Sequence, residues 1–254
     1  MSKILSIKKK ITPFNKQIYV SGDKSLSIRW VLLASQAIGK SKAYNLLMSA
    51  DVVAALKSIK KLGIKVLLHK AHCEIFGNGI NGFRYKKSLV IDAKNSGTLG
   101  RLILGLLIKS PKKIKIIGDK SLSKRDFSRV TEPLGKFGAK FYYKTKNKLP
   151  LSILGSQLPR GINYIENKGS AQCKSSVMLA ALNSSGTTFV KAKKSRNHSE
   201  LLFKYLKIPI KIKKTKKYDF IKIKQPKKIN AFNYQIPGDI SSSAFFMVLT
   251  ILTN

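Results

Sequence analysis

Short apolar runs typical of β-strands end at glycine-centred turns in this chain, and each turn is followed by an apolar periodicity typical of a helix. The turns centre on Gly22, Gly97, Gly169 and Gly238, with spacings of 75, 72 and 69 residues. Self-similarity at a nearly fixed period indicates a repeated structural unit. We therefore predict that one unit of strands and helices recurs along the chain.

A second landmark recurs in phase with the glycines. Asp51, Asp126 and His198 each lie 29 residues beyond one of the first three glycines, at or near the start of another helical pattern. Gly63 and Gly138 are natural ends for the first two of these helices. Strand-like runs follow at residues 64–68, 140–143 and 208–212. Each unit is thus predicted as strand, helix, strand, helix, strand, strand. A coincidental phase is the alternative, and two landmarks in register argue against it.

Three units are complete, and a fourth begins at Gly238, sixteen residues before the end of the sequence. Its predicted helix is apolar from Ala244 to Leu252, and such a helix needs cover from other elements. The same stretch is too short to span a bilayer. The alternation of strands and helices predicts an α/β protein.

Composition adds one unusual feature, a formal net charge of +39 in 254 residues. Clustered lysine and arginine displace counterions from phosphates, so a basic nucleic-acid-binding protein is one alternative. The lysines are spread over the whole chain, however, with neither an aromatic-rich RNA-binding signature nor zinc-finger spacing. A specific nucleic-acid partner is therefore not expected. Hydrophobic residues make up 43% of the chain, which argues against disorder.

Cysteine and histidine usage points away from disulfides and metals. Cys73 and Cys173 are far apart, so we expect neither a disulfide framework nor a metal cluster. His69, His72 and His198 offer no ligand spacing with acidic partners. The basic start of the chain lacks the continuous apolar run of a signal peptide. The expectation is a reduced cytoplasmic protein with no membrane partner.

The repeated turns suit anion binding. A glycine turn that opens a helix presents unpaired backbone N–H groups, and the helix dipole adds positive potential there. The first turn also carries Lys24, Ser25 and Arg29, and the last two share one helix face because they are four residues apart. A lysine, a hydroxyl and an arginine fork together suit a phosphorylated, carboxylated substrate. A capped helix with solvated cations is the alternative. P-loop spacing is missing.

Seven segments, in order along the chain, are GDKSLSIR (22–29), NLLMSADV (45–52), NSGTLGR (95–101), SLSKR (121–125), SAQCKS (170–175), SRNHSE (195–200) and PGDISSSAFF (237–246). Together they resemble the sequence motifs of the EPSP synthase family, and the resemblance covers roughly residues 20–254. The stretch 118–129 lacks the reactive cysteine typical of the related UDP-N-acetylglucosamine enolpyruvyl transferases, which favours the shikimate enzyme.

The resemblance implies an inside-out α/β barrel of three repeated βαβαββ units, in a protein with two such domains and an active site between them. Residues 21–228 would form the three-unit substrate-binding domain. Residues 1–20 and 229–254 would be segments of an incomplete second domain. The family's proposed general base lies in the absent part, so none is assigned here. A complete enzyme is expected to be a monomer.

The implied reaction transfers the enolpyruvyl group of phosphoenolpyruvate to the 5-hydroxyl of shikimate 3-phosphate, releases phosphate and serves aromatic amino-acid biosynthesis. It uses no metal or organic cofactor in this family. The implied shikimate 3-phosphate contacts are Lys24, Ser25, Arg29, Ser170, Ala171, Gln172, Ser195 and Arg196. The implied phosphoenolpyruvate contacts are Asn95, Gly97 and Arg125, with Lys24 and Gln172 touching both ligands.

Lys24, Arg125 and Gln172 are the implied catalytic residues, with lysine and arginine charges stabilising the phosphates and the developing oxyanion. Asp51 and Asp239 match family positions near the cleft, and simple helix capping is the alternative for both.

Four positions depart from the family motifs, namely Ser96, Gly100, Leu102 and Asp126. Asp126 adjoins Arg125 and is expected to weaken anion binding by drawing on the charge of that arginine. Three interpretations remain open. The chain is a fragment of a normal enzyme, a reduced protein that needs a partner, or a non-catalytic anion-binding module.

Overall fold

The computed structural model describes residues 15–253 and confirms the predicted α/β class and repeat. The first unit contains α1 (Lys24–Ser35), β1 (Ile38–Tyr44), α2 (Ala50–Lys61), β2 (Lys65–Leu68) and β3 (His72–Asn78). The second contains β4 (Val90–Asp92), α3 (Gly97–Leu106), β5 (Ile114–Ile117), α4 (Lys120–Ser123), α5 (Ser128–Lys136), β6 (Lys140–Tyr143) and β7 (Leu151–Leu154). The third contains β8 (Asn163–Glu166), α6 (Ala171–Ala181), β9 (Thr187–Lys193), α7 (His198–Tyr205), β10 (Ile210–Lys214) and β11 (Tyr218–Lys224). The strand β12 (Asn233–Gln235) and the helix α8 (Ile240–Thr253) follow.

Local capping explains where the first helix of each unit begins. The side chains of Asp23, Ser96 and Ser170 accept hydrogen bonds from backbone N–H groups three residues further on, at 2.6, 3.2 and 3.3 Å. Gly63 and Gly138 follow α2 and α5 with φ values of +84° and +97°, a conformation that favours glycine. The predicted helix starts and stops therefore follow from short-range chemistry.

The three sheets share one topology. Their strand orders are β12-β1-β3-β2, β4-β5-β7-β6 and β8-β9-β11-β10. In each sheet the first pair is parallel and the remaining pairs are antiparallel. In the first sheet β12 takes the place that β4 and β8 take in the others, with Lys42 opposite Asn233 and Tyr44 opposite Gln235.

This topology corrects one prediction about the first unit. The apolar run before Gly22 was expected to be a strand, but residues 18–20 lie in none, and Gly22 forms only an isolated antiparallel bridge with Gly238. The strand that completes the sheet comes instead from segment 229–254. It therefore lies beyond the predicted boundary at residue 228.

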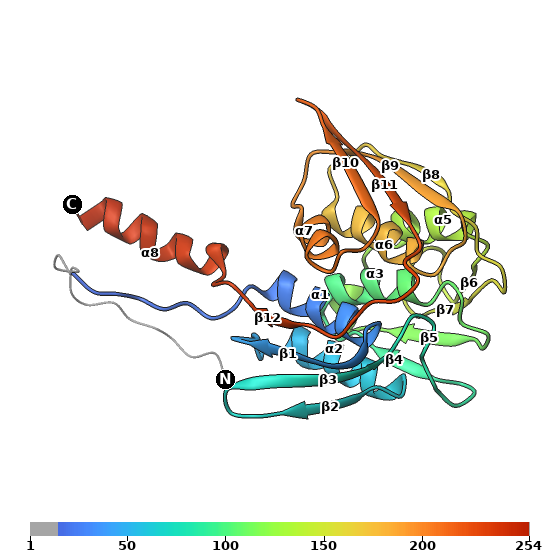
Figure 1. The fold of residues 1–254 in the computed structure, drawn as a ribbon, viewed down its shortest axis with the longest axis horizontal. Coiled ribbons are helices and arrows are strands. Elements are labelled where there is room, and N and C mark those ends of the chain that lie inside the picture. The colour runs from blue at the N-terminus through green and yellow to red at the C-terminus, as the bar shows by residue number, and fades with distance from the viewer. Residues whose placement is uncertain (1–14, 254) are drawn as a thin grey trace.

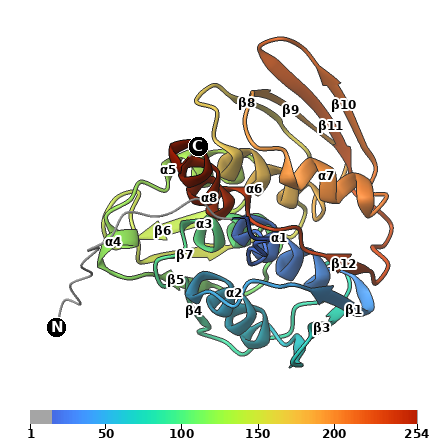
Figure 2. The ribbon, with the colours of Figure 1, turned by 90° about the vertical axis from the view of Figure 1, so that its left-hand side faces the viewer.

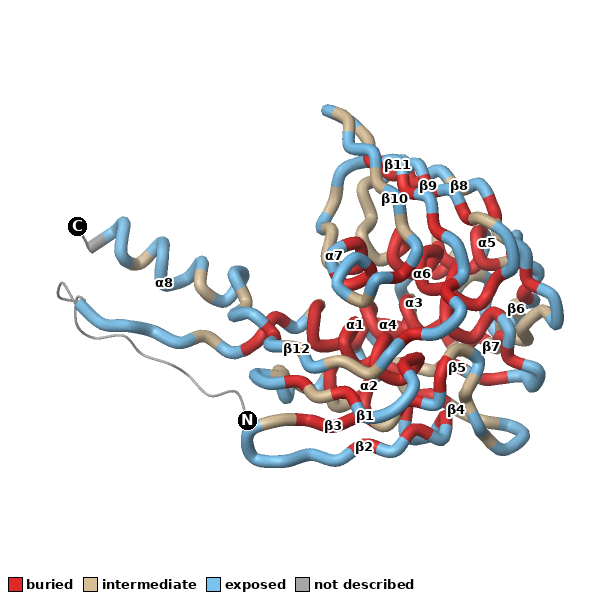
Figure 3. Tube along the Cα trace, viewed as in Figure 1, coloured by how far each residue is buried: buried red, intermediate tan, exposed pale blue. Residues whose placement is uncertain are grey.

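The helices α1, α3 and α6 lie inside and the sheets lie outside, as Figures 1 and 2 show. Ten of the twelve residues of α1, nine of the ten of α3 and nine of the eleven of α6 are buried, so these three helices form the centre (Figure 3). The helices α3 and α6 approach closely at Gly105, where a Cβ atom would lie 2.2 Å from the carbonyl oxygen of Ser176. No strand pairing joins the three sheets within residues 15–253, so the barrel is not closed by hydrogen bonds.

The last helix, α8, extends away from this body (Figure 1). It exposes large apolar side chains, including Phe245 at 78%, Ile251 at 75% and Leu252 at 77% of their area. Within residues 15–253, no other element covers these apolar side chains. Among the described helices, none combines the length and apolar character needed to cross a membrane.

Candidate active site

Four helices, α1, α3, α6 and α7, begin around one hollow of about 270 Å³. Its lining residues are Ser25, Arg29, Thr98, Ser170, Ala171, Gln172, Arg196 and His198. No acidic side chain is among these described lining residues. Helix N-termini carry partial positive charge and free N–H groups, so the hollow favours an anion.

Arg29 is the most firmly held cation of the hollow. It is 4% exposed, and its Nε and Nη2 atoms donate to the hydroxyl oxygens of Ser199 at 2.9 Å and Ser175 at 3.0 Å. Its Nη1 donates to the carbonyl oxygen of Ser25 at 3.0 Å. Burial lowers the pKa of Arg29 from 12.5 to about 10, although the Glu200 carboxylate partly opposes the change. The guanidinium is therefore charged at neutral pH and fixed in orientation.

Gln172 connects two of the central helices. Its Oε1 accepts a hydrogen bond from Nη1 of Arg101 at 2.9 Å, and its Nε2 donates to Oγ1 of Thr98 at 3.0 Å. Arg101 also donates to the carbonyl oxygen of Asp126 at 3.3 Å and lies 5.1 Å from the ring centroid of Phe127. Burial lowers the pKa of Arg101. The side-chain amide of Gln172 is thereby held in one orientation at the edge of the hollow.

Two guanidinium groups converge at the first residue of α3. A Cβ atom at Gly97 would lie 2.9 Å from Nη1 of Arg101 and 3.0 Å from Nη1 of Arg125. Arg125 also donates from Nη2 to Oδ1 of Asn95 at 3.3 Å. The arrangement therefore presents two cations to an anion at the start of α3.

Lys24 lies beside the hollow but does not line it. It is exposed, and its Nζ is 3.4 Å from Oδ2 of Asp51. Its backbone N–H donates to Oδ2 of Asp239 at 3.4 Å. Asp239 also accepts from the backbone of Ser241 at 2.8 Å, which is the helix-capping role considered for it. Asp51 and Asn95 line a separate hollow of about 550 Å³.

Two buried polar atoms near the hollow have no hydrogen-bond partner among the described residues. They are the hydroxyl of Ser195 and Nδ1 of His198. Burial lowers the pKa of His198, and the charges of Arg29 and Arg196 lower it further, although Asp23 opposes the change. A buried polar group without a partner is costly unless a ligand or water pairs with it.

A buried ion pair lies behind the hollow. Lys174 on α6 and Glu200 on α7 are 2.5 Å apart between Nζ and Oε1, with side-chain exposures of 0% and 5%. The pair joins the two helices whose first residues line the hollow. Because a buried charge without its partner is expensive, neither residue can be neutralised alone at low cost.

The carboxylate of Asp126 hydrogen-bonds to Ser128 rather than to the neighbouring Arg125. Its carboxylate accepts hydrogen bonds from the backbone N–H and hydroxyl of Ser128, at 2.7 and 2.8 Å. Those hydrogen bonds lower the pKa of Asp126. Arg125 donates instead to Asn95. The geometry therefore gives Asp126 a role in starting α5 and offers no direct contact through which it would weaken Arg125.

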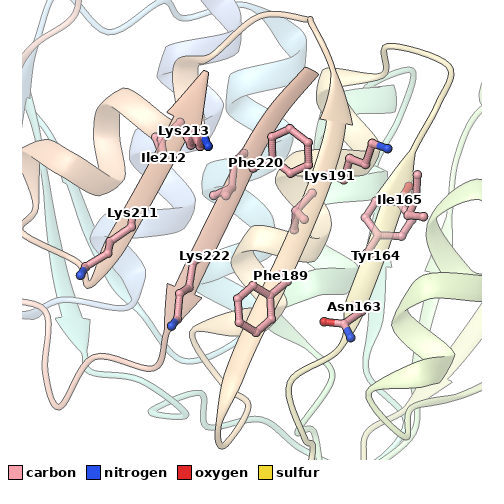
Figure 4. Close-up of a pocket in the computed structure, with 12 residues that line it drawn as sticks. Asn163, Tyr164, Ile165, Phe189, Lys191, Lys211, Ile212, Lys213, Phe220 and Lys222 are labelled. Carbon is pink, nitrogen blue, oxygen red and sulfur yellow. The ribbon is translucent and has the colours of Figure 1, made fainter. Parts of the chain in front are cut away.

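A different hollow, of about 420 Å³, lies on the outer face of the third sheet (Figure 4). Phe189, Lys191, Phe220 and Lys222 lie side by side on β9 and β11 there. The Nζ atoms of Lys222 and Lys191 lie 5.3 and 5.9 Å from the ring centroids of Phe189 and Phe220. None of the predicted site residues lines this face.

Six predicted site residues line the 270 Å³ hollow, namely Ser25, Arg29, Ser170, Ala171, Gln172 and Arg196. Five others do not line it, namely Lys24, Asn95, Gly97, Arg125 and Ser195. Sequence reasoning gave no role to Thr98, Arg101 or His198, although all three lie inside the quoted motifs. Arg101 follows Gly97 by four residues on one helix face, a spacing that could have identified it.

Metal-binding capacity lies elsewhere. Among the described residues, one group of histidine and carboxylate side chains could hold an ion, namely His69, His72 and Glu74. It shares no residue with the hollow.

Comparisons with known proteins agree with this arrangement. The family model described as EPSP synthase (3-phosphoshikimate 1-carboxyvinyltransferase) matches residues 8–254. The chain is 37% identical to a 3-phosphoshikimate 1-carboxyvinyltransferase of Bacillus subtilis over 240 residues, which cover 94% of this chain and 55% of that relative. It is 40% identical to one of Ruthia magnifica over 230 residues, covering 90% and 52%.

The fold is also similar to a solved EPSP synthase of Acinetobacter baumannii, with a TM-score of 0.83 and 33% identity over 91% of this chain and 52% of that one. The chain thus spans about half the length of the relatives it matches. With its three units, its helix-terminal hollow and a family match over nearly its whole length, the chain belongs to the EPSP synthase family.

Proposed function

We propose that this chain forms the shikimate 3-phosphate side of a site that transfers the enolpyruvyl group of phosphoenolpyruvate to the substrate's 5-hydroxyl and releases phosphate. The observation that carries the proposal is the hollow of about 270 Å³ at four helix N-termini, lined by two arginines and by no acidic side chain of the described chain. A phosphorylated and carboxylated ligand suits a hollow with this lining.

Shikimate 3-phosphate brings a phosphate, a carboxylate and hydroxyl groups. Arg29 offers a guanidinium that three hydrogen bonds hold in place, and Arg196 offers an exposed one that can close on the ligand. Ser25 and Ser170 offer hydroxyl groups at helix starts. The unpartnered hydroxyl of Ser195 is available for a further hydrogen bond. These groups are complementary to the charges and hydroxyl groups of the substrate.

Phosphoenolpyruvate would bind next to this ligand, at the convergence of Arg101 and Arg125 over Gly97. Gln172 supports that placement, because it lines the hollow and also accepts a hydrogen bond from Arg101. Lys24 would exchange its 3.4 Å contact with Asp51 for a substrate oxygen.

Catalysis in such a site rests on electrostatics and positioning. The 5-hydroxyl oxygen adds to C2 of phosphoenolpyruvate while the hydroxyl loses its proton and C3 gains one, which gives a tetrahedral intermediate. Loss of phosphate from C2 and of a proton from C3 then restores the double bond and completes the transfer. Fixed cations stabilise the charge that develops in these steps, and the two ligands are held in attack geometry. Because the relatives are about twice as long as this chain, we place the remaining groups, including any general base, in the part of those proteins that this chain does not match.

The proposal is tested first by calorimetric titration of the chain with shikimate 3-phosphate. Arg196→Gln should weaken binding about tenfold, as expected for the loss of one charge-assisted hydrogen bond. Lys194→Gln, which makes the same charge change on a residue that does not line the hollow, should leave binding unchanged. Equal weakening in both variants, or no binding by the unaltered chain, would refute the proposed site.

Phosphate release from both substrates then separates an enzyme from a binding module. Turnover above that of Lys24→Ala would mean that this chain suffices for catalysis. Binding without turnover would identify it as a half-site that needs the rest of the enzyme or a partner.

A further inference from the structure

Two histidines and a glutamate come together on the outer face of the first sheet. His69 and His72 close the hairpin between β2 and β3, where the backbone N–H of His69 donates to the carbonyl oxygen of His72 at 2.9 Å. Glu74 follows His72 by two residues on the same strand, so both side chains emerge on one face. The spacing of these residues along the sequence does not match a helical metal-binding motif, because it is the hairpin turn that brings His69 beside His72.

The three side chains are close enough to share one ion. Nε2 of His72 lies 3.4 Å from Oε1 of Glu74, and Nε2 of His69 lies 3.7 Å from Oε2 of Glu74. All the donor atoms lie within 4.8 Å of one another. Two ligand atoms about 2.1 Å from one zinc ion at a tetrahedral angle are roughly 3.4 Å apart. Small side-chain movements would therefore bring all three into coordination distance.

We propose that His69, His72 and Glu74 form a surface binding site for a late first-row divalent ion of the Zn²⁺ type. Two imidazoles and one carboxylate are a donor set that such ions favour over magnesium or calcium. The two rings stack at 4.5 Å between centroids with an interplanar angle of 20°, and Nε2 of each lies within 3.7 Å of a Glu74 carboxylate oxygen. Water would complete the coordination sphere, because His69 is 45% exposed and His72 is 22% exposed.

Two lysines compete with the ion for Glu74. Nζ of Lys42 is 3.2 Å and Nζ of Lys40 is 3.5 Å from Oε1, the oxygen that also faces His72. Both lysines are partly exposed and can move their ammonium groups into water on flexible stems. The site is therefore one in which the ion displaces lysine from the carboxylate. The ion would join the ends of β2 and β3 and stabilise the hairpin.

The competition gives the proposal a distinctive test. Zinc is titrated into the 254-residue chain without an affinity tag, with calorimetry as the readout, and Co²⁺ is added separately to record visible absorption. We expect one ion per chain. His72→Gln and Glu74→Gln should each weaken binding about tenfold or more, since each removes one of three ligands. Lys42→Gln should strengthen binding several-fold, because it removes a nearby like charge and a competitor for Oε1.

Lys222→Gln is the matched control, since it makes the same charge change on the third sheet. It should leave zinc affinity unchanged. The proposal fails if the unaltered chain binds no zinc at about 1 mM. It also fails if the double variant His69→Gln/His72→Gln binds as the unaltered chain does, or if Lys222→Gln strengthens binding as much as Lys42→Gln. Melting curves without zinc verify that each variant folds.

Discussion

At the scale of single residues, the site depends on which atoms can approach one another. Gly97 shows this most clearly, because the missing side chain leaves the space in which Arg101 and Arg125 converge. The cations of the site are also held by neighbours that carry no charge. Arg29 is oriented by two serine hydroxyls and a carbonyl oxygen, and Arg101 is oriented by the side-chain amide of Gln172 and the carbonyl oxygen of Asp126.

A methyl group at Gly97 should separate the two arginines. In Gly97→Ala the new Cβ would lie 2.9 and 3.0 Å from their Nη1 atoms, so the side chains must move. We expect phosphoenolpyruvate binding, measured by calorimetry with shikimate 3-phosphate present, to weaken about tenfold. Gly100→Ala is the control, since its Cβ would make only ordinary contacts at 3.5–3.6 Å. If both variants weaken binding equally, the approach of the two arginines at Gly97 is not what binds phosphoenolpyruvate.

His198 should take up a proton when a dianion enters the hollow. Burial lowers its pKa from 6.5, so the imidazole is neutral in the free chain near pH 7. A bound phosphate adds negative charge beside it and raises that pKa, so binding near pH 6.5 should consume protons. Titrations in buffers of different ionisation enthalpy measure this uptake. His198→Gln should abolish it, and uptake that persists in this variant would assign the proton to another group.

The lowered pKa of His198 also makes the stability of the folded chain depend on pH. Because the folded pKa lies below the unfolded value, the unfolded chain binds more protons at mildly acidic pH. The stability associated with a neutral His198 is therefore complete above about pH 6.5 and declines as the pH falls toward the folded pKa.

At the scale of elements, the hollow is a meeting of helix ends, and the packing behind it keeps them together. Gly105 allows α3 to lie against α6, and the pair Lys174–Glu200 joins α6 to α7. The ion pair is enclosed, so its contribution differs from that of the many exposed lysines. Exposed pairs such as Lys94 with Asp92 stabilise a protein little.

Breaking the buried pair should destabilise the chain strongly. Glu200→Gln leaves the fully buried Lys174 ammonium without its partner, so we expect the free energy of unfolding to fall by about 3–5 kcal/mol in urea denaturation. The double variant Lys174→Met/Glu200→Leu removes both charges and should recover most of that loss. A double variant no more stable than Glu200→Gln would show that packing, rather than the unpaired charge, explains the effect.

At the scale of the whole molecule, the first sheet is completed by a strand whose residues lie 191 positions beyond their pairing partners in β1. Residue 233 pairs with Lys42, and the neighbouring Ile229 and Ile236 are 1% and 0% exposed. The first sheet of the three-unit body therefore includes a strand from residues 229–254, the segment predicted to belong to a second domain. By contrast, α8 packs little against this body and displays its apolar side chains.

Two truncations should separate these contributions. A chain ending at residue 238 keeps β12 and should retain the cooperative unfolding of the full chain, while losing the exposed apolar surface of α8. A chain ending at residue 228 loses β12 and leaves the edge of β1 unpaired, so it should unfold at lower denaturant concentration and aggregate more readily. Thermal melts and light scattering of the two chains provide the comparison. Equal stability would contradict a structural role for β12.

The sequence by itself determined the units and most of their helices. Capping side chains, glycine stops and apolar periodicity act over a few residues, so Gly22, Gly97 and Gly169 mark helix starts without knowledge of the fold. The same locality explains why Ser25 and Arg29 could be assigned to an anion site, since they lie four residues apart within the first turns of one helix. Gln172 was assigned only through the resemblance of its motif to those of the family.

Tertiary structure alone decided which strand completes the first sheet and which side chains meet. The run before Gly22 has the apolar character of a strand, but edge pairing with β1 is made by β12, and pairing partners are not encoded locally. Likewise, Lys174 meets Glu200, and Arg101 meets Gln172, only because separate helices pack together. Local chemistry therefore specifies elements, whereas long-range packing and strand pairing specify the site that they build.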